Sequence, residues 1–295
     1  MAGLFVLGLA PRLILLAARH ADLEFWEYET LARNIIAGDG YVISRFGHLA
    51  LGFGDGNLYT FLTAALYLVT GHHPLVVAVI QALLAACVAP VIYVIGERSI
   101  GAIPAMLGAA LAALHPGLMA YTLKLHPLGL DVLLLTLVVL WGGRATWTRQ
   151  SGLTTALALG MSLMTRPTFF VACAAGLGAR WLLRRQGLAA TFGVVLLGAA
   201  IATPWIARNT VFIGRPVMIT TSLEDVWKGN NPNANGSSLL TADKDMFASA
   251  SPELQARFMA ADELQLNDLF LQETAEFVRQ QPGLFANLVG RKFMY

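Results

Sequence analysis

The sequence predicts an all-α, polytopic membrane protein. Of its 295 residues, 56% are hydrophobic and 13% are charged, and the mean hydropathy is +0.61, whereas a soluble domain carries roughly 25% charged residues. The segment from Leu75 to Ile95 contains no charged residue and is long enough to cross a bilayer. Because backbone groups inside a bilayer must pair with one another, such a segment is expected to be a helix.

Other apolar segments extend this prediction to a bundle of about seven spans. Met1 to Ala18 is interpreted as the first span, since it lacks the basic start of a signal peptide and other long apolar stretches follow it. The remaining predicted spans are Ile100 to Leu118, Leu125 to Trp141, Leu153 to Met164, Pro167 to Leu183 and Leu188 to Ala207.

The charged residues predict which side of the membrane each loop faces. Basic residues collect in short cytoplasmic loops, and here they fall at every second turn, at Arg98, Arg144, Arg149, Arg180, Arg184 and Arg185. All acidic residues except Glu97 and Asp131 lie before residue 74 or after residue 207. We therefore expect an inner-membrane protein with a core at 1–207, an external loop at 19–73 within it, and an extracytoplasmic region at 208–295.

The external loop is longer than a simple connection needs, and long loops are often functional. Glu24 to Ala37 has the pattern of an amphipathic helix, with Tyr28 on its apolar side, and Gly38 is expected to end it. Leu58 to Val69 is apolar but short for a span. Both helices are expected to lie along the membrane surface.

The C-terminal region is predicted to be helical from Pro252 to about Gln280. The sequence ends with basic and aromatic residues from Arg291 to Tyr295, a composition typical of the interface at which a span begins. We therefore expect a further span beyond Tyr295.

Several kinds of partner and cofactor are disfavoured by the composition. No block of Lys and Arg could neutralise a run of phosphates, so we expect no nucleic-acid partner. Cys87 and Cys173 lie inside apolar runs and suggest neither a disulfide nor a metal site. The histidines lack zinc-ligand spacing, and they lie in outer loops or at span ends, at His20, His48, His72, His73, His115 and His126. No cofactor is assigned with certainty, and a divalent cation is left open.

Two cations stand out because they lie among apolar residues near an outer membrane boundary. Lys124 and Arg166 would be costly there unless paired or solvated, so each is a candidate for binding a substrate phosphate. Two plainer readings stay open for Lys124. It could reach water along its own stem, or it could form a bridged salt link with Asp131, two turns away on the same helical face.

Four short motifs occur in a consistent order along the chain. Glu24 and Tyr28 are followed by Ala32-Arg33-Asn34, Gly38 and Gly40-Tyr41. The others are Met164-Thr165-Arg166-Pro167; Thr203-Pro204-Trp205 with Arg208-Asn209; and Gly229-Asn230-Asn231-Pro232 with Gly236. Together they resemble the polytopic glycosyltransferases of the C superfamily, in particular the bacterial relatives of dolichyl-phosphate-mannose protein mannosyltransferases and of lipid A aminoarabinose transferases.

The resemblance implies a donor whose sugar is linked through phosphate to a polyprenyl chain, and transfer on the non-cytoplasmic face to a protein, lipid or glycan acceptor that the sequence does not identify. It implies that an acidic residue of the first loop is the general base. Glu24 stands where relatives usually show Asp, four residues before Tyr28, and Asp22 is the second choice. The segment Gly54-Asp55-Gly56-Asn57-Leu58-Tyr59 replaces a Pro-Pro-x-Tyr-Pro-like segment.

The same resemblance assigns substrate binding to residues within its motifs, and the chemistry gives these assignments a reason. Transfer from a lipid phosphate needs a carboxylate to deprotonate the acceptor and cations to hold the leaving phosphate. The motif residues expected to bind substrate are Arg166, Tyr28, Arg33, Arg208, Asn230 and Asn231, and Lys124 is added because it is a cation among apolar residues. Two alternatives remain: a transporter or flippase of lipid-linked substrates, and a non-catalytic protein that binds the polyprenyl lipid.

The predicted orientation can be tested by labelling single cysteines. In a chain whose Cys87 and Cys173 are replaced, we expect cysteines at Asp39 or Ser237 to react with a membrane-impermeant thiol reagent from outside the intact membrane, because both lie in predicted outer regions. A cysteine at Arg144 is the control and should react only after permeabilisation. The predicted orientation is wrong if the cysteines at Asp39 and Ser237 react only after permeabilisation.

Overall fold

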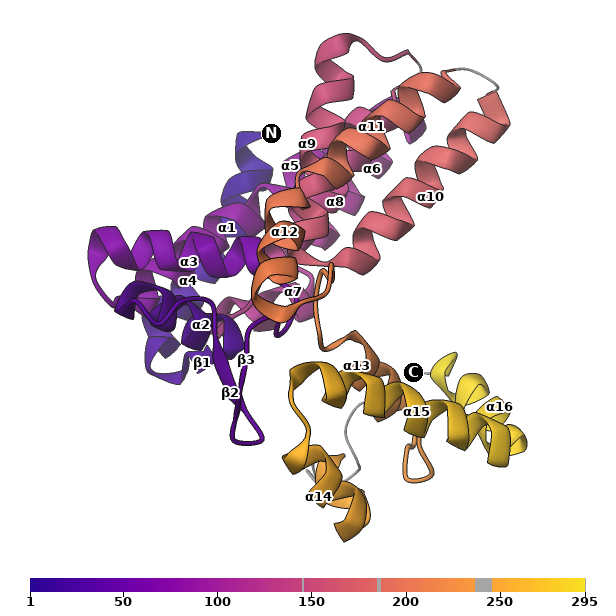
Figure 1. Ribbon diagram of the computed structural model, residues 1–295. Coiled ribbons are helices and arrows are strands. Elements are labelled where there is room, and N and C mark those ends of the chain that lie inside the picture. Colours follow the sequence, from indigo (N-terminus) through magenta and orange to yellow (C-terminus); the bar gives the residue numbers. More distant parts are fainter. Residues whose placement is uncertain (145, 185–186, 237–245, 295) are drawn as a thin grey trace. The chain divides into compact units, whose positions relative to one another are not determined.

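A computed structural model describes residues 1–144, 146–184, 187–236 and 246–294 (Figure 1). Ser237, one of the labelling positions, lies outside these residues. The chain is mostly helical, as the sequence predicts. It divides into two compact units, the first formed by Met1–Gly40 with Asp55–Trp205, and the second by Tyr41–Gly54 with the described residues from Ile206 onward. The first unit thus ends near the predicted boundary at 207, but part of the first loop belongs to the second.

The first unit is a bundle of helices with one short parallel β-ladder. The ladder pairs β1 (Glu24–Phe25) with β4 (Lys124–Leu125). The helices are α1 (Ala2–Arg19), α2 (Glu27–Ala37), α3 (Asn57–Thr70), α4 (Pro74–Ala86), α5 (Val88–Ile100), α6 (Ala102–Ala113), α7 (Pro116–Ala120), α8 (Leu128–Gly142), α9 (Arg149–Thr165), α10 (Pro167–Arg184) and α11 (Leu188–Ala200), and α12 (Thr203–Ile213) leads into the second unit.

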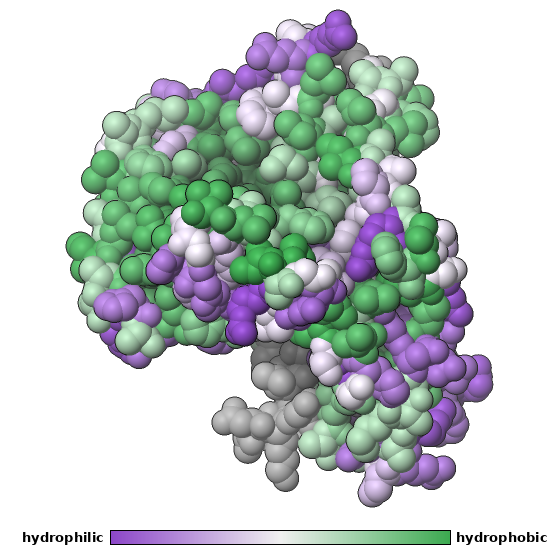
Figure 2. Space-filling model, turned by 60° about the vertical axis from the view of Figure 1, so that its left-hand side comes forward, coloured by the Kyte–Doolittle hydropathy of each residue, from purple (hydrophilic) through white to green (hydrophobic). Residues whose placement is uncertain are grey.

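Among the described residues, three helical segments are long and apolar enough to cross a membrane, namely Ala2–Asp22, Pro74–Ile100 and Ala102–Leu123, and a fourth is added if α11 and α12 form one broken span. Apolar side chains cover much of the first unit on the face seen in Figure 2. On α6, Ile103, Leu107 and Leu111 are each more than 60% exposed. Their spacing of four residues places them on one outward face of the helix. Seven spans stay a prediction.

Helix α2 begins three residues later than the sequence suggests. Glu24 and Phe25 are extended because they pair with Lys124 and Leu125 of β4, and a ladder to a residue a hundred positions away leaves no local signal. The end of α2 is as predicted: Gly38 has φ +93°, and its N–H reaches the carbonyls of Asn34 and Ile35. Glycine adopts this left-handed conformation readily, so it ends the helix.

Arg12 lies within α1 yet is almost fully buried, with 1% of its surface exposed. Its Nη1 donates to the carbonyl oxygen of Gly8 in the same helix and, at 3.0 Å, to that of Ala113 at the end of α6. The last carbonyls of a helix have no partner within it. The arginine therefore satisfies an orphan acceptor and ties α1 to α6.

Helices α9 and α11 approach closely because small residues face each other. A Cβ added to Gly160 would lie 2.5 Å from the carbonyl oxygen of Gly198 and 2.4 Å from Cδ1 of Ile201. Small residues allow this approach between helices in membranes, where packing rather than water exclusion drives association. This contact fixes the end of α9, which carries residues of the site described below.

The second unit has a mainly aromatic core formed by Trp227, Phe247, Phe258, Phe270 and Phe277. Its elements are a hairpin of β2 (Ile43–Arg45) and β3 (His48–Ala50), followed by α13 (Ser222–Gly229), α14 (Pro252–Ala260), α15 (Glu263–Gln280) and α16 (Pro282–Lys292).

The prediction of helical structure from Pro252 to about Gln280 is confirmed at both bounds, but the region is formed by two helices, α14 and α15. The helical conformation is interrupted at Ala261 and Asp262. The Asp262 side chain caps α15 by accepting a hydrogen bond from the backbone N–H of Gln265. A reciprocal bond from the Asp262 backbone to the Gln265 side chain completes the capping box.

The close approach of α9 and α11 predicts the sign of a stability change. Gly160→Ala should lower the midpoint of thermal unfolding in detergent, because the new methyl group meets backbone atoms that cannot move cheaply. Overpacking costs roughly 1–3 kcal/mol. Gly193→Ala on α11 is the matched control, since nothing lies within 4 Å of its added Cβ. The contact is unimportant if both variants unfold at the same temperature.

Candidate functional site

The β1–β4 ladder places a candidate base beside a candidate phosphate-binding cation. Glu24 is opposite Lys124 in the register, and Lys124 Nζ lies 2.7 Å from Glu24 Oε2. The hydrogen bond from Lys124 holds the pKa of Glu24 below its ordinary value, so the carboxylate stays charged. Half of the Glu24 side chain is exposed, and exposed ion pairs contribute only about 0–1 kcal/mol. A competing anion could therefore separate this pair at small cost.

The second candidate cation, Arg166, lies directly after α9. Pro167 follows it, and a residue before proline is biased away from the helical conformation. Arg166 accordingly has φ −149° and ψ 98°, so the helix ends there. Its Nε lies 3.2 Å from Oδ2 of Asp131, a fully buried carboxylate in the first turn of α8. The Lys124–Asp131 link considered from sequence is therefore wrong: each residue has another partner.

Tyr28 and Asp55 join the Arg166 cluster from two other segments. The Tyr28 hydroxyl donates to Asp55 Oδ1 at 3.2 Å, and Asp55 also interacts electrostatically with Arg166. Burial raises the pKa of Tyr28, with the Asp55 charge adding to the effect, so the phenol stays protonated as a donor.

Gly56 allows the approach of Asp55 to Tyr28. It has φ +78°, and a Cβ at this position would lie 2.4 Å from Cε1 of Tyr28. The Gly56 N–H also donates to the carbonyl oxygen of Thr165 at 2.6 Å. The loop that carries Asp55 is thereby tied to the end of α9, one residue before Arg166.

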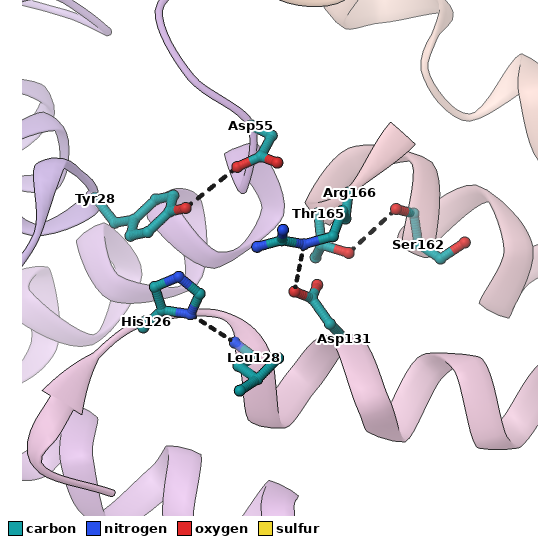
Figure 3. Close-up of polar contacts among 8 residues, drawn as sticks. All are labelled: Tyr28, Asp55, His126, Leu128, Asp131, Ser162, Thr165 and Arg166. Carbon is teal, nitrogen blue, oxygen red and sulfur yellow. Dashed lines mark hydrogen bonds and ion pairs between the residues drawn. The ribbon is translucent and has the colours of Figure 1, made fainter. Parts of the chain in front are cut away.

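His126 lies beside Tyr28 in the Arg166 cluster (Figure 3) and also contacts Trp26, the neighbour of Glu24. Its ring contacts Trp26 edge-on at a centroid distance of 5.0 Å and Tyr28 at 5.5 Å, and Trp26 in turn donates to Glu24 at 2.9 Å. His126 Nδ1 accepts from the backbone N–H of Leu128 at 3.1 Å. An accepting nitrogen carries no proton, so the imidazole is neutral, with its proton on Nε2.

These side chains form one chemical arrangement, which we call the outer cluster: Glu24, Tyr28, Asp55, Lys124, His126, Asp131 and Arg166. In Figure 3, the side chains of Tyr28, Asp55, His126 and Arg166 point toward one another. Two cations, Lys124 and Arg166, can hold an anion, while the half-exposed Glu24 can accept a proton. Asp131 is fully buried and serves to balance Arg166.

Two other predicted residues of the first loop lie at the surface. Asp22 is 51% exposed and pairs with Arg19, three residues earlier. Arg33 is 60% exposed and reaches Glu29 within its own helix only at 3.9 Å. Each pair is local along the sequence. Within the part of the chain that the structure describes, neither residue contacts the outer cluster, so the geometry favours Glu24 over Asp22.

The remaining predicted substrate-binding residues belong to the second unit and hold its loops. Arg208 donates to the carbonyl oxygens of Leu51 and, at 3.0 Å, of Tyr41. Asn230 accepts from Lys292 Nζ at 2.7 Å. Asn231 is buried and donates to the Trp227 carbonyl at 2.9 Å. These contacts give the three side chains structural roles within their unit.

The sequence interpretation did not assign roles to Asp55 and His126. Asp55 lies in the segment that departs from the resembled family, so no motif pointed to it. His126 was grouped with interfacial histidines, because among the described residues two of its three aromatic neighbours, Trp26 and Tyr28, are distant in sequence and only Tyr121 is near. One local pattern could have pointed to His126. Pro127 and Asp131 follow it closely and mark the polar start of a helix inside an apolar region.

Among the residues that the structure describes, no group of three or more His, Cys, Asp or Glu could hold a metal ion. The divalent cation left open by the sequence stays a prediction. Comparison with models of protein families, with curated proteins and with solved structures gave no match.

The ion pair between the buried Asp131 and Arg166 leads to a prediction about stability. Arg166→Gln should destabilise the protein by roughly 3–5 kcal/mol, because it leaves a buried carboxylate without a balancing charge. Adding Asp131→Asn to that variant should recover part of the loss. Thermal unfolding in detergent measures both, and Arg33→Gln, an exposed arginine, is the control. A double variant less stable than Arg166→Gln would contradict the pairing.

Proposed function

We propose that this protein is a membrane glycosyltransferase that moves a sugar from a polyprenyl-phosphate carrier to an acceptor hydroxyl. The observation that carries the proposal is the outer cluster, in which a half-exposed carboxylate, Glu24, lies beside Lys124, and which also holds a second cation, Arg166. The motif resemblance supports the same chemistry, and the protein, lipid or glycan nature of the acceptor stays open.

The two parts of the donor, its phosphate and its polyprenyl chain, suit the two cations and the apolar helices respectively. A sugar-linked phosphodiester carries a negative charge, which Lys and Arg can hold through charge-assisted hydrogen bonds. Lys124 is 30% exposed and Arg166 29% exposed, so both can be reached by such a group while their stems remain packed. The polyprenyl chain would remain in the bilayer beside the apolar helices of the first unit.

The proposed transfer step forms one bond and breaks one bond at the anomeric carbon of the sugar. Glu24 takes the proton from the acceptor hydroxyl, and the acceptor oxygen forms a bond to the anomeric carbon of the sugar. The bond between that carbon and the phosphate oxygen breaks, and the polyprenyl phosphate leaves with the electron pair. Lys124 and Arg166 stabilise the charge that develops on the leaving oxygen.

The ion pair between Glu24 and Lys124 sets a condition for this step. While Lys124 donates to Glu24, the carboxylate is a poor base. Binding of the donor phosphate would draw Lys124 away and free Glu24 for the acceptor. The base would thus be activated when the donor is in place.

A transfer assay with full-length protein tests the proposal. With labelled polyprenyl-phosphate sugars, Glu24→Gln should lower the transfer rate roughly 10²- to 10⁴-fold, the usual contribution of a general base, while donor affinity changes little. Lys124→Gln should mainly weaken donor binding. Asp22→Asn and the exposed Asp39→Asn should behave like the parent.

The outcomes separate the rival functions. If Glu24→Gln and Asp22→Asn both transfer at the parent rate, the catalytic assignment fails. If the parent binds the donor without transferring its sugar to any acceptor, the non-catalytic lipid-binding function replaces it. Movement of the intact labelled lipid across vesicles by the parent, without transfer, would instead support the flippase function.

A further inference from the structure

An apolar groove runs between α8 and α10 in the first unit, away from the outer cluster. It measures about 530 Å³, within the range of ligand pockets in proteins. Its walls are made by Leu135, Val138 and Val139 of α8 and by Cys173, Gly176 and Leu177 of α10, among others. The groove lies toward the Gly142 end of α8, and Gly142 is roughly 16 Å along the helix from Asp131.

Glycines explain why the two helices leave this space. At Gly142 the helices are in contact, because an added Cβ would lie 2.9 Å from Cδ2 of Leu177. At Gly176 nothing lies within 4 Å of an added Cβ, although this residue lines the groove. The helices therefore close at one point and stay open beside it, so a side chain at 176 would enter the groove.

The groove continues into a basic region at the same end of α8. A second cavity of about 750 Å³ shares Val139 and Gly143 with it and is lined by Arg98 and Arg144. Arg180 lines the groove itself, and its Nη2 donates to the Arg144 carbonyl oxygen at 2.7 Å. The described residues that line the two cavities include no Asp or Glu. An anion there would meet positive charge alone.

We infer that this continuous site binds an anionic phospholipid, with an acyl chain in the α8–α10 groove and the phosphate against Arg98 and Arg144. The apolar walls match a hydrocarbon chain. Guanidinium groups bind phosphate through paired hydrogen bonds, and basic pockets between membrane helices recognise anionic headgroups. The basic residues also mark the end predicted to face the cytoplasm, where anionic lipid would be in the inner leaflet.

This site uses none of the residues assigned to sugar transfer. A lipid there would fill the open side of the bundle and hold α10 against α8. The inference therefore stands or falls independently of the proposed function.

Native mass spectrometry of the purified full chain in detergent, titrated with phosphatidylglycerol or phosphatidylcholine, tests the inference. We expect retention of phosphatidylglycerol in preference to phosphatidylcholine. Arg98→Gln and Arg144→Gln should each weaken phosphatidylglycerol binding roughly fivefold, which corresponds to about 1 kcal/mol for each basic residue near a lipid surface. Arg149→Gln is the control, since Arg149 is exposed and outside the lining residues.

The groove is tested separately from the charges. Gly176→Leu should reduce retention of phosphatidylglycerol by filling the groove, whereas Gly178→Leu should not. Gly178 is on the same helix and has open space around its added Cβ, but it does not line the groove. Unchanged thermal unfolding of both variants shows that each is folded.

Three results would overturn the inference. Equal retention of both lipids by the parent would remove the role of the arginines. Equal phosphatidylglycerol binding by the Gly176→Leu and Gly178→Leu variants would remove the role of the groove. A lower oligomeric mass for Gly176→Leu, with lipid binding unchanged, would show that a second copy of the chain occupies the groove instead.

Discussion

The outer cluster depends on the charge balance between Asp131 and Arg166. A carboxylate that is fully buried in an apolar helix needs a cation, and Arg166 supplies it from the end of α9. This contact fixes the position of Thr165, whose carbonyl oxygen accepts from Gly56. The loop through Gly56 in turn brings Asp55 to the buried hydroxyl of Tyr28. One ion pair thus aligns four segments that are distant in sequence.

The ion pair of Glu24 and Lys124 differs from the Asp131–Arg166 pair because its carboxylate is exposed to solvent. Half of the Glu24 side chain is in contact with solvent, and the ladder that joins it to Lys124 has only two residues on each strand. Pairs of this kind add little stability, so their partners can be exchanged for a substrate without unfolding the site. The pair formed by the buried Asp131 is therefore suited to holding the framework, and the Glu24–Lys124 pair is suited to releasing a base, while both cations remain about 30% exposed and can be reached by a phosphate. His126 is neutral and packs against Trp26 and Tyr28.

Helix α8 connects the two places at which we propose that this unit binds charged lipid. Its first turn carries Asp131, and its last residue, Gly142, borders the groove that continues toward Arg98 and Arg144. Between them the helix is apolar apart from Thr136. A donor phosphate at one end and a phospholipid at the other would therefore be held by different residues, and each could be altered without removing the other.

The sequence by itself determined that the chain is mostly helical and has helices long and apolar enough to cross a membrane, because apolar runs such as Pro74–Ile100 carry that information locally. It also located the end of α2 at Gly38, where a left-handed residue is required. It singled out Lys124 and Arg166, since cations among apolar residues are costly. Only the tertiary structure decided their partners, Glu24 and Asp131, and added Asp55 and His126. The Arg166–Asp131 and Lys124–Glu24 pairs join residues 35 and 100 positions apart, and no local pattern specifies contacts over such separations.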